Sequence, residues 1–267
     1  MPLPDATRLG AVHLSVADLP RSLDYYRRSI GLDVLDEGDG EASLGAGGTE
    51  LLHLVEEPGA APADGYTGLF HYALLLPERT DLARWLAHAA RERVPLTGAS
   101  DHFVSEALYL RDPDHHGIEI YWDRPRAHWE GQVGRMGTWP LDLDDILRTL
   151  PDPETASFGG LPDGTTMGHV HLRVSDVDET VRFYRDGLGL DLMAQLGPQA
   201  AFMSWAGYHH HLGANTWESR GADPAPDGTA RLLRYTIVLP TEAERDELLA
   251  QIGELRDPSG NVFSLTA

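Results

Sequence analysis

Hydrophobic and polar side chains near the N-terminus first alternate and then follow a helical spacing. Residues 12–16 (VHLSV) place His13 and Ser15 on one face of a predicted strand and three aliphatic side chains on the other. Residues 19–30 then repeat their hydrophobic positions as an amphipathic helix does, with Asp18 as the N-cap. Later strands are separated by glycine-rich turns. The pattern predicts a strand–helix–strands module whose polar strand face lines a cavity.

This module recurs in the second half of the chain. The segment LGAVHLSVADLPRSLDYYRRSIGLDVL, from residue 9, returns without a gap as MGHVHLRVSDVDETVRFYRDGLGLDLM, from residue 167. The alignment pairs His13 with His171 and, at the end of the module, His53 with His211. A repeat of this length indicates a duplicated structural unit.

A second pair of related segments divides each half again. LFHYALLLP (69–77) resembles LLRYTIVLP (232–240), and the turns RDPDHHGIEI and RDPSGNVFSL follow them after a helix-like stretch. His71 falls against Arg234, and Glu119 falls against Ser264. The chain therefore contains four modules, and the last one is shorter and lacks the carboxylate.

These modules predict an α+β fold with two domains. Residues 1–125 form the first domain and residues 166–267 the second, whose last module is degenerate and shortened. Residues 126–165 form a connector rich in Pro, Gly and Trp, with a short helix expected at DLDDILRTL.

The repeat, together with the segment at residues 100–122, resembles the vicinal-oxygen-chelate superfamily (the glyoxalase, bleomycin-resistance and dioxygenase fold). Within it, the chain is similar to two-domain, ring-cleaving extradiol dioxygenases of the catechol 2,3-dioxygenase type. The segment holds His102, Tyr109, Asp112-Pro113 and Glu119 in the order of the extradiol signature. The resemblance covers residues 9–125 and 167–267. It implies four βαβββ modules paired into two glyoxalase-like domains.

The ligands of a metal site are expected among histidines and carboxylates because the chain has no cysteine. The resemblance implies one histidine from the first strand of one module, a second from the first strand of the paired module, and a glutamate from that module's last strand. His13, His71 and Glu119 hold these places in the first domain. Such a set suits iron(II), with manganese(II) as the alternative, and leaves positions open for substrate and O₂.

Three further side chains are expected to act on protons during catalysis. The resemblance implies that His102 and Tyr109 donate hydrogen bonds to a metal-bound oxygen. His53, on the last strand of the first module, is the candidate acid–base histidine. His115 and His116 are expected to be exposed turn residues.

The second domain has a histidine cluster of its own. His169 and His171 share one strand face, and His209-His210-His211 follow. These side chains either form a separate zinc or copper site or belong to a degenerate copy that makes hydrogen bonds or an interface.

Charge and hydropathy limit the partners. The net charge of −21 argues against nucleic acid as a partner. No apolar run approaches the roughly 20 residues of a membrane span, and the N-terminus lacks a secretory core, so a cytoplasmic protein without a membrane partner is expected. The expected partners are a small aromatic substrate and O₂, and a homo-oligomer is compatible with the sequence.

Two other functions fit the same fold. A glyoxalase- or epimerase-like isomerase needs a fourth ligand, for which Glu50 is the nearby carboxylate, although strand alternation places it opposite to His53. A non-enzymatic resistance protein that binds a small molecule needs no metal ligands. The extradiol hypothesis predicts metal-dependent opening of a catechol- or hydroquinone-like ring beside its two oxygens.

Overall fold

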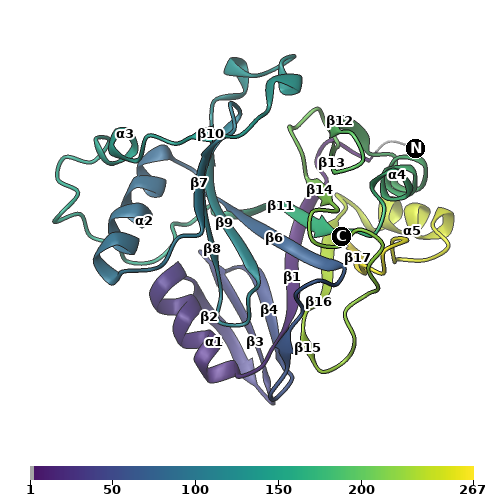
Figure 1. Ribbon diagram of the computed structural model, residues 1–267, viewed down its shortest axis with the longest axis horizontal. Helices are drawn as coiled ribbons and strands as arrows, with labels where there is room; N and C mark the ends of the chain where they lie inside the picture. The colour runs from purple at the N-terminus through teal and green to yellow at the C-terminus, as the bar shows by residue number, and fades with distance from the viewer. Residues whose placement is uncertain (1–2) are drawn as a thin grey trace.

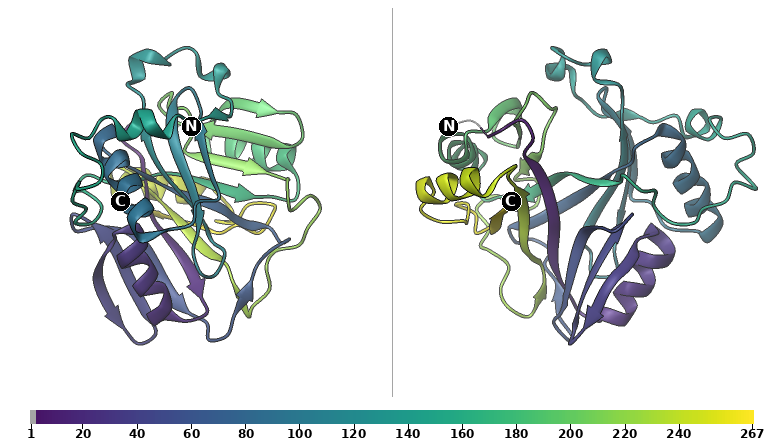
Figure 2. Two further views of the ribbon diagram at one scale, coloured as in Figure 1. Left: turned by 60° about the vertical axis from the view of Figure 1, so that its left-hand side comes forward. Right: turned by 180° about the vertical axis from the view of Figure 1, so that it is seen from behind.

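The computed structural model describes residues 3–267 as two main β-sheets with helices at the outside (Figure 1). The α+β class expected from the sequence is confirmed. Helices α1 and α2 lie on the left of Figure 1 and helices α4 and α5 on the right, and the view from behind in Figure 2 shows the same separation. Within the described residues, no helix is long and apolar enough to cross a membrane.

The first sheet combines the first module with the fourth. Its six strands lie in the order β17-β16-β1-β4-β3-β2. They are β1 (Arg8–Val16), β2 (Asp33–Gly38), β3 (Glu41–Ala46), β4 (Thr49–Glu56), β16 (Leu232–Val238) and β17 (Phe263–Thr266).

The second sheet combines the second module with the third. Its nine strands lie in the order β10-β7-β8-β9-β6-β11-β14-β13-β12. They are β6 (Gly68–Leu75), β7 (Gly98–Asp101), β8 (Ser105–Arg111), β9 (Gly117–Asp123), β10 (Trp139–Pro140), β11 (Thr166–Arg173), β12 (Asp191–Leu196), β13 (Ala200–Ser204) and β14 (Leu212–Asn215). A short separate pair joins β5 (Ala61–Pro62) to β15 (Thr229–Ala230).

The five helices follow the modules. They are α1 (Leu19–Tyr25), α2 (Arg79–Glu92), α3 (Leu143–Leu147) in the connector, α4 (Val177–Arg182) and α5 (Glu242–Gln251). Asp18 caps α1 by accepting from the backbone N–H of Arg21. A π-helical turn continues α1, and Gly31 ends it with φ +90°, a left-handed conformation that glycine adopts without strain.

The pairing of modules corrects the expectation that each half of the chain closes its own sheet. Strand β1 pairs with β16, and strand β6 pairs with β11, so each sheet takes one module from each half. Strand β9 ends at Asp123 and strand β11 begins at Thr166, and the connector lies between them. A repeat identifies equivalent strands but does not say which strands share hydrogen bonds, and this is why the sequence missed the exchange.

Helix and sheet are joined by the same contact in both halves. Asp112, in the turn before β9, accepts from the backbone of Asp114 and His116 at 2.9 and 2.8 Å and from the hydroxyl of Tyr26 at 2.7 Å. Asp257 repeats this with Tyr184 at 3.2 Å. The Asp-Pro turn is therefore a structural anchor between modules. His115 adopts φ +70° and is exposed, as expected, whereas His116 is buried and bonds to the Ser15 carbonyl at 2.9 Å, contrary to the prediction.

Candidate metal centre

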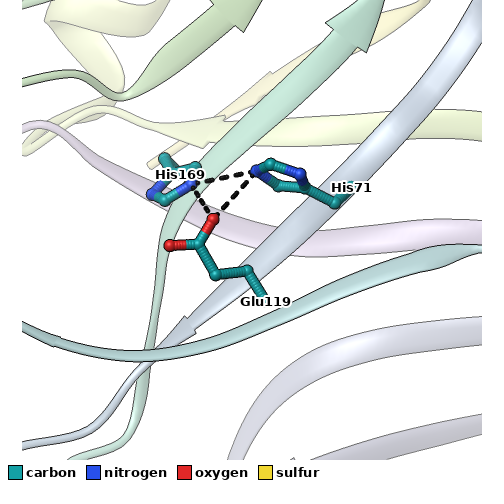
Figure 3. Close-up of side chains that lie close together, drawn as sticks. All are labelled: His71, Glu119 and His169. Atoms are coloured by element: carbon teal, nitrogen blue, oxygen red, sulfur yellow. Dashed lines mark hydrogen bonds and ion pairs between the residues drawn. The ribbon is translucent and has the colours of Figure 1, made fainter. Parts of the chain in front are cut away.

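Three side chains from neighbouring strands of the nine-stranded sheet converge on one point (Figure 3). His71 comes from β6, Glu119 from β9 and His169 from β11, the two strands that flank β6. The Nε2 atoms of His71 and His169 each lie 3.0 Å from Oε2 of Glu119 and 3.3 Å from each other. The sheet order thus brings the ligands of two modules to one place.

Burial and charge favour the protonation states that bind metals. Burial lowers the pKa of His71, so this imidazole stays neutral. Burial alone would raise the pKa of Glu119, but the facing imidazoles of His169 and His71 outweigh it and hold that pKa well below its ordinary range. The group therefore presents a neutral nitrogen at His71 and a carboxylate at Glu119.

This donor set fits a divalent metal ion. All three side chains are buried, and their ligand atoms lie within 4.8 Å of one another. Lone pairs that converge without water are costly unless a proton or a cation lies between them. Two imidazoles and one carboxylate are the facial ligand set of non-heme iron(II) enzymes.

A cavity of about 500 Å³ opens onto these ligands. His102 and Tyr109 line it, as does Gly137 of the connector. His102 Nε2 lies 2.6 Å from the Tyr109 hydroxyl, and His102 Nδ1 lies 2.6 Å from the Gly137 carbonyl. Burial, and then Glu119, raise the pKa of Tyr109 well above its ordinary value, so the phenol keeps its proton.

Two more histidines of the third module border the same cavity. The His171 ring lies 4.9 Å from that of His71, and its buried Nε2 atom has no hydrogen-bond partner within the described residues. The His210 ring lies 4.2 Å from that of His169. His211 points elsewhere and stacks on Trp205. Three histidines of the cluster expected in the second half, His169, His171 and His210, therefore line one cavity shared with the second module.

Aromatic side chains form much of the remaining wall. Phe70, Phe202 and Trp217 line the cavity. Phe70 reaches it beside His71 because the pairing of β6 with β11 shifts between His71 and Leu69, so a β-bulge turns two consecutive side chains to one face. Regular strand alternation would place Phe70 on the face opposite to His71.

A comparison with known families agrees with this fold. Residues 8–120 and 166–265 match the family model described as the Glyoxalase/Bleomycin resistance protein/Dioxygenase superfamily. The chain belongs to this superfamily. The resemblance inferred from the sequence is confirmed.

One sequence relative and one solved structure support different conclusions. Catechol-2,3-dioxygenase of Bacillus subtilis (strain 168) is 42% identical over 247 residues, which make up 90% of this chain and 85% of the relative. The crystal structure of glyoxalase I from Zea mays aligns over 97% of this chain and 92% of the maize chain, with a TM-score of 0.57 and 17% identity. The maize enzyme supports the superfamily fold alone.

The place expected for His13 in the metal centre is filled by His169. His13 lies on β1 in the six-stranded sheet, opposite His53 on β4 and Arg234 on β16. This correction has two parts. His71 pairs with the third module and not with the first, and the third member of the group is His169, two residues before His171, the repeat equivalent of His13. His169 and His171 lie on the same face of β11. The sequence pattern singled out both histidines but connected neither of them to His71.

His53, the expected acid–base residue, also lies on the six-stranded sheet, and it contacts Glu41 and Glu50 at 3.3 and 3.4 Å. A bulge between β3 and β4 brings Glu50 to the face of His53, which strand alternation had excluded. Neither residue belongs to the His71–Glu119–His169 group or lines its cavity. The fourth ligand considered for an isomerase is therefore not supplied by Glu50.

Proposed function

We propose that the protein is an extradiol dioxygenase that opens a catechol- or hydroquinone-like ring with O₂, and that His71, Glu119 and His169 hold its iron(II), with manganese(II) as the alternative. The observation that carries the proposal is a buried two-histidine, one-carboxylate group at the wall of a cavity, in a chain related to catechol-2,3-dioxygenase of Bacillus subtilis. When bound there, the metal supplies open coordination positions for ring oxygens and O₂ and a route for electrons between them.

The cavity is suited to one aromatic ring. Its volume of about 500 Å³ lies in the range of small-molecule sites. Phe70 and Trp217 contact each other edge to face, with centroids 5.2 Å apart, and both also contact the ring of His171. This apolar wall favours a flat ring and excludes water, while the polar ligands at the other wall orient its oxygens.

Tyr109 and His102 hold a proton next to the ligands. The Gly137 carbonyl can only accept, so Nδ1 of His102 carries a hydrogen and, in the neutral ring, Nε2 accepts from the Tyr109 hydroxyl. The phenol oxygen can then accept from a substrate hydroxyl, and proton exchange between Tyr109 and His102 needs no movement of either ring. The connector thereby takes part in the site through one backbone carbonyl.

His210 is the imidazole placed to accept a proton from the ring. Its Nδ1 is engaged by His209 at 2.8 Å, which leaves Nε2 for the substrate. Activation of a ring hydroxyl requires such a base, and a neutral imidazole serves near physiological pH. We therefore assign to His210 the acid–base role first considered for His53.

The test combines metal analysis with an aerobic assay. Protein purified without a His-tag and reconstituted with iron(II) or manganese(II) is screened with catechols and hydroquinones for the yellow ring-opened product and for O₂ uptake. His169→Ala and Glu119→Ala are expected to lose the metal and at least about 10³-fold in kcat/KM, because the metal activates both substrates. His13→Ala is the matched control and is expected to keep both.

Three outcomes would contradict the proposal. Full activity of His169→Ala would exclude His169 as a metal ligand. Loss of metal in His13→Ala would support His13 as the ligand, as expected from the sequence. Metal-dependent turnover of a substrate without O₂ uptake would instead favour an isomerase.

A further inference from the structure

A buried chain of hydrogen bonds leads from the cavity to the end of strand β9. His210, at the cavity wall, contacts His209 through their Nδ1 atoms at 2.8 Å. His209 Nε2 contacts Oδ1 of Asp123 at 2.9 Å. The two histidines belong to the third module and Asp123 to the second, so the chain crosses the same boundary as the metal centre.

The carboxylate of Asp123 is held from its other side. Tyr208 donates to Oδ2 at 2.7 Å, and the Tyr208 oxygen lies 2.9 Å from the hydroxyl of Tyr121. His209 is fully buried and packs on Tyr208, with ring centroids 3.9 Å apart, and against Trp129 at 5.6 Å. The rings therefore cannot turn without breaking several contacts.

Counting hydrogens along this chain leaves one arrangement when each imidazole carries one. A carboxylate only accepts, so Nε2 of His209 carries its hydrogen. Nδ1 of His209 is then bare and can only accept, so Nδ1 of His210 must carry the hydrogen between the two rings. Nε2 of His210 is left with a free lone pair. An uncharged His210 is favoured because this ring is buried and lies against His169.

We propose that Asp123 is a positioning residue that fixes, through His209, the tautomer of His210 and so presents its Nε2 atom to the cavity as a hydrogen-bond acceptor. With the opposite tautomer Nε2 would carry a hydrogen and could not accept one from a ring hydroxyl. The catalytic consequence of this inference rests on the proposed function, whereas the tautomer itself does not.

The tautomer is tested by nuclear magnetic resonance on the full chain with ¹⁵N-labelled histidine, loaded with diamagnetic zinc(II). The His210 signals are assigned by their loss in His210→Gln. We expect hydrogen on Nδ1 and an unprotonated Nε2 in the wild type. In Asp123→Asn, the amide carbonyl accepts from Tyr208 and the NH₂ group donates to His209, which reverses the order and moves the His210 hydrogen to Nε2. Tyr208→Phe, which leaves the Asp123–His209 contact in place, is expected to keep the wild-type tautomer.

The kinetic readout follows the same comparison. Asp123→Asn is expected to lower kcat by about 10-fold or more with KM and metal content unchanged, in line with the range for general base catalysis, and Tyr208→Phe to change kcat by less than about threefold.

Hydrogen on Nε2 of His210 in the wild type would overturn the proposal, as would an unchanged tautomer in Asp123→Asn. A reversed tautomer with unchanged kcat would support the role of Asp123 but remove His210 from the proposed proton transfer. Absence of ring opening with every substrate would count against the proposed function alone, because the resonance measurement needs no turnover.

Discussion

The concave faces of the two sheets are built from equivalent strands in the same register but carry different chemistry. His13 lies opposite Arg234 in the six-stranded sheet, and His171 lies opposite His71 in the nine-stranded sheet. On the adjacent strand, Ser264 pairs with Thr236 where Glu119 pairs with Ala73. The backbone therefore offers the same positions twice, and a ligand group forms at one of them.

Three substitutions between the copies account for this difference. Ala11, Arg234 and Ser264 occupy the places of His169, His71 and Glu119. A methyl group, a guanidinium and a hydroxyl cannot replace two imidazoles and a carboxylate, because arginine donates hydrogen bonds and offers no lone pair. The fold provides convergence, and the side chains decide whether it becomes a metal centre.

The largest expected effect in this comparison concerns Gly117, next to the ligands. A Cβ atom there would lie 2.0 Å from the Phe70 carbonyl oxygen and 3.0 Å from the His71 Cβ. Val262 occupies the equivalent place beside β16. Gly117→Ala is expected to reduce the free energy of unfolding by about 3 kcal/mol, and Val262→Ala by about 1 kcal/mol, measured by urea unfolding. Equal losses in the free energy of unfolding would mean that the backbone beside β6 has as much room for a side chain at this position as the backbone beside β16.

A smaller effect is expected at Gly213, which faces His171 as His53 faces His13. A Cβ atom at Gly213 would lie 2.7 Å from Cγ of His171, so Gly213→Ala pushes that ring toward the cavity. We expect kcat/KM to fall about 10-fold, a loss of about 1.4 kcal/mol in transition-state binding, with metal content retained. The control His53→Ala is expected to leave kcat/KM unchanged, and a matching loss there would show that the six-stranded face contributes to turnover.

The smallest effect concerns pH and the six-stranded face. Burial, and then Arg234, lower the pKa of His13 from 6.5 to about 4. The unfolded chain takes up this proton first, so the stability that neutral His13 contributes is present above pH 6.5 and is lost as the pH falls to about 4.

The matched variant isolates this contribution. Between pH 6.5 and about 4, the free energy of unfolding of His13→Gln is expected to fall by about 1 kcal/mol less than that of the wild type. This figure allows for screening by water, because His13 is only partly buried. Chemical unfolding at both pH values measures it. The buried histidines of the other sheet destabilise both proteins in acid, so the difference between them is the quantity to compare. Identical pH profiles would contradict the lowered pKa.

The modules, their order and two of the three side chains of the proposed metal site could be predicted from the sequence. His71 and Glu119 stand out because each is a polar residue flanked by hydrophobic neighbours in a segment expected to be a strand. His169 could not be chosen over His13 or His171, since all three lie on the polar face of a first strand. The sheet order and the position along β11 decide which of these imidazoles meets Glu119. Partner choice between duplicated strands is a tertiary property that local patterns do not encode.

Bulges and irregular segments explain the other differences. The Glu50 and Phe70 side chains change face because the strand pairing slips by one residue beside each of them, and Gly45 lies at the first of these slips. His209 and His210 precede β14 outside regular structure, so no periodicity assigned their direction. Three consecutive histidines did mark the region, which was the available signal for His210.

The exchange of modules between the sheets has a consequence for assembly of the protein. His71 and His169 are 98 positions apart in the chain, and β1 and the backbone before β16 meet over 216 positions. Contacts of such sequence separation form late in folding because a long loop must close first. A nascent first half already contains His71 and Glu119 but has no third ligand. High-affinity metal binding is therefore expected to begin only after synthesis of β11. Bound metal would then indicate that β11 has paired with β6 in the nine-stranded sheet, whereas the six-stranded sheet still awaits β16 and β17.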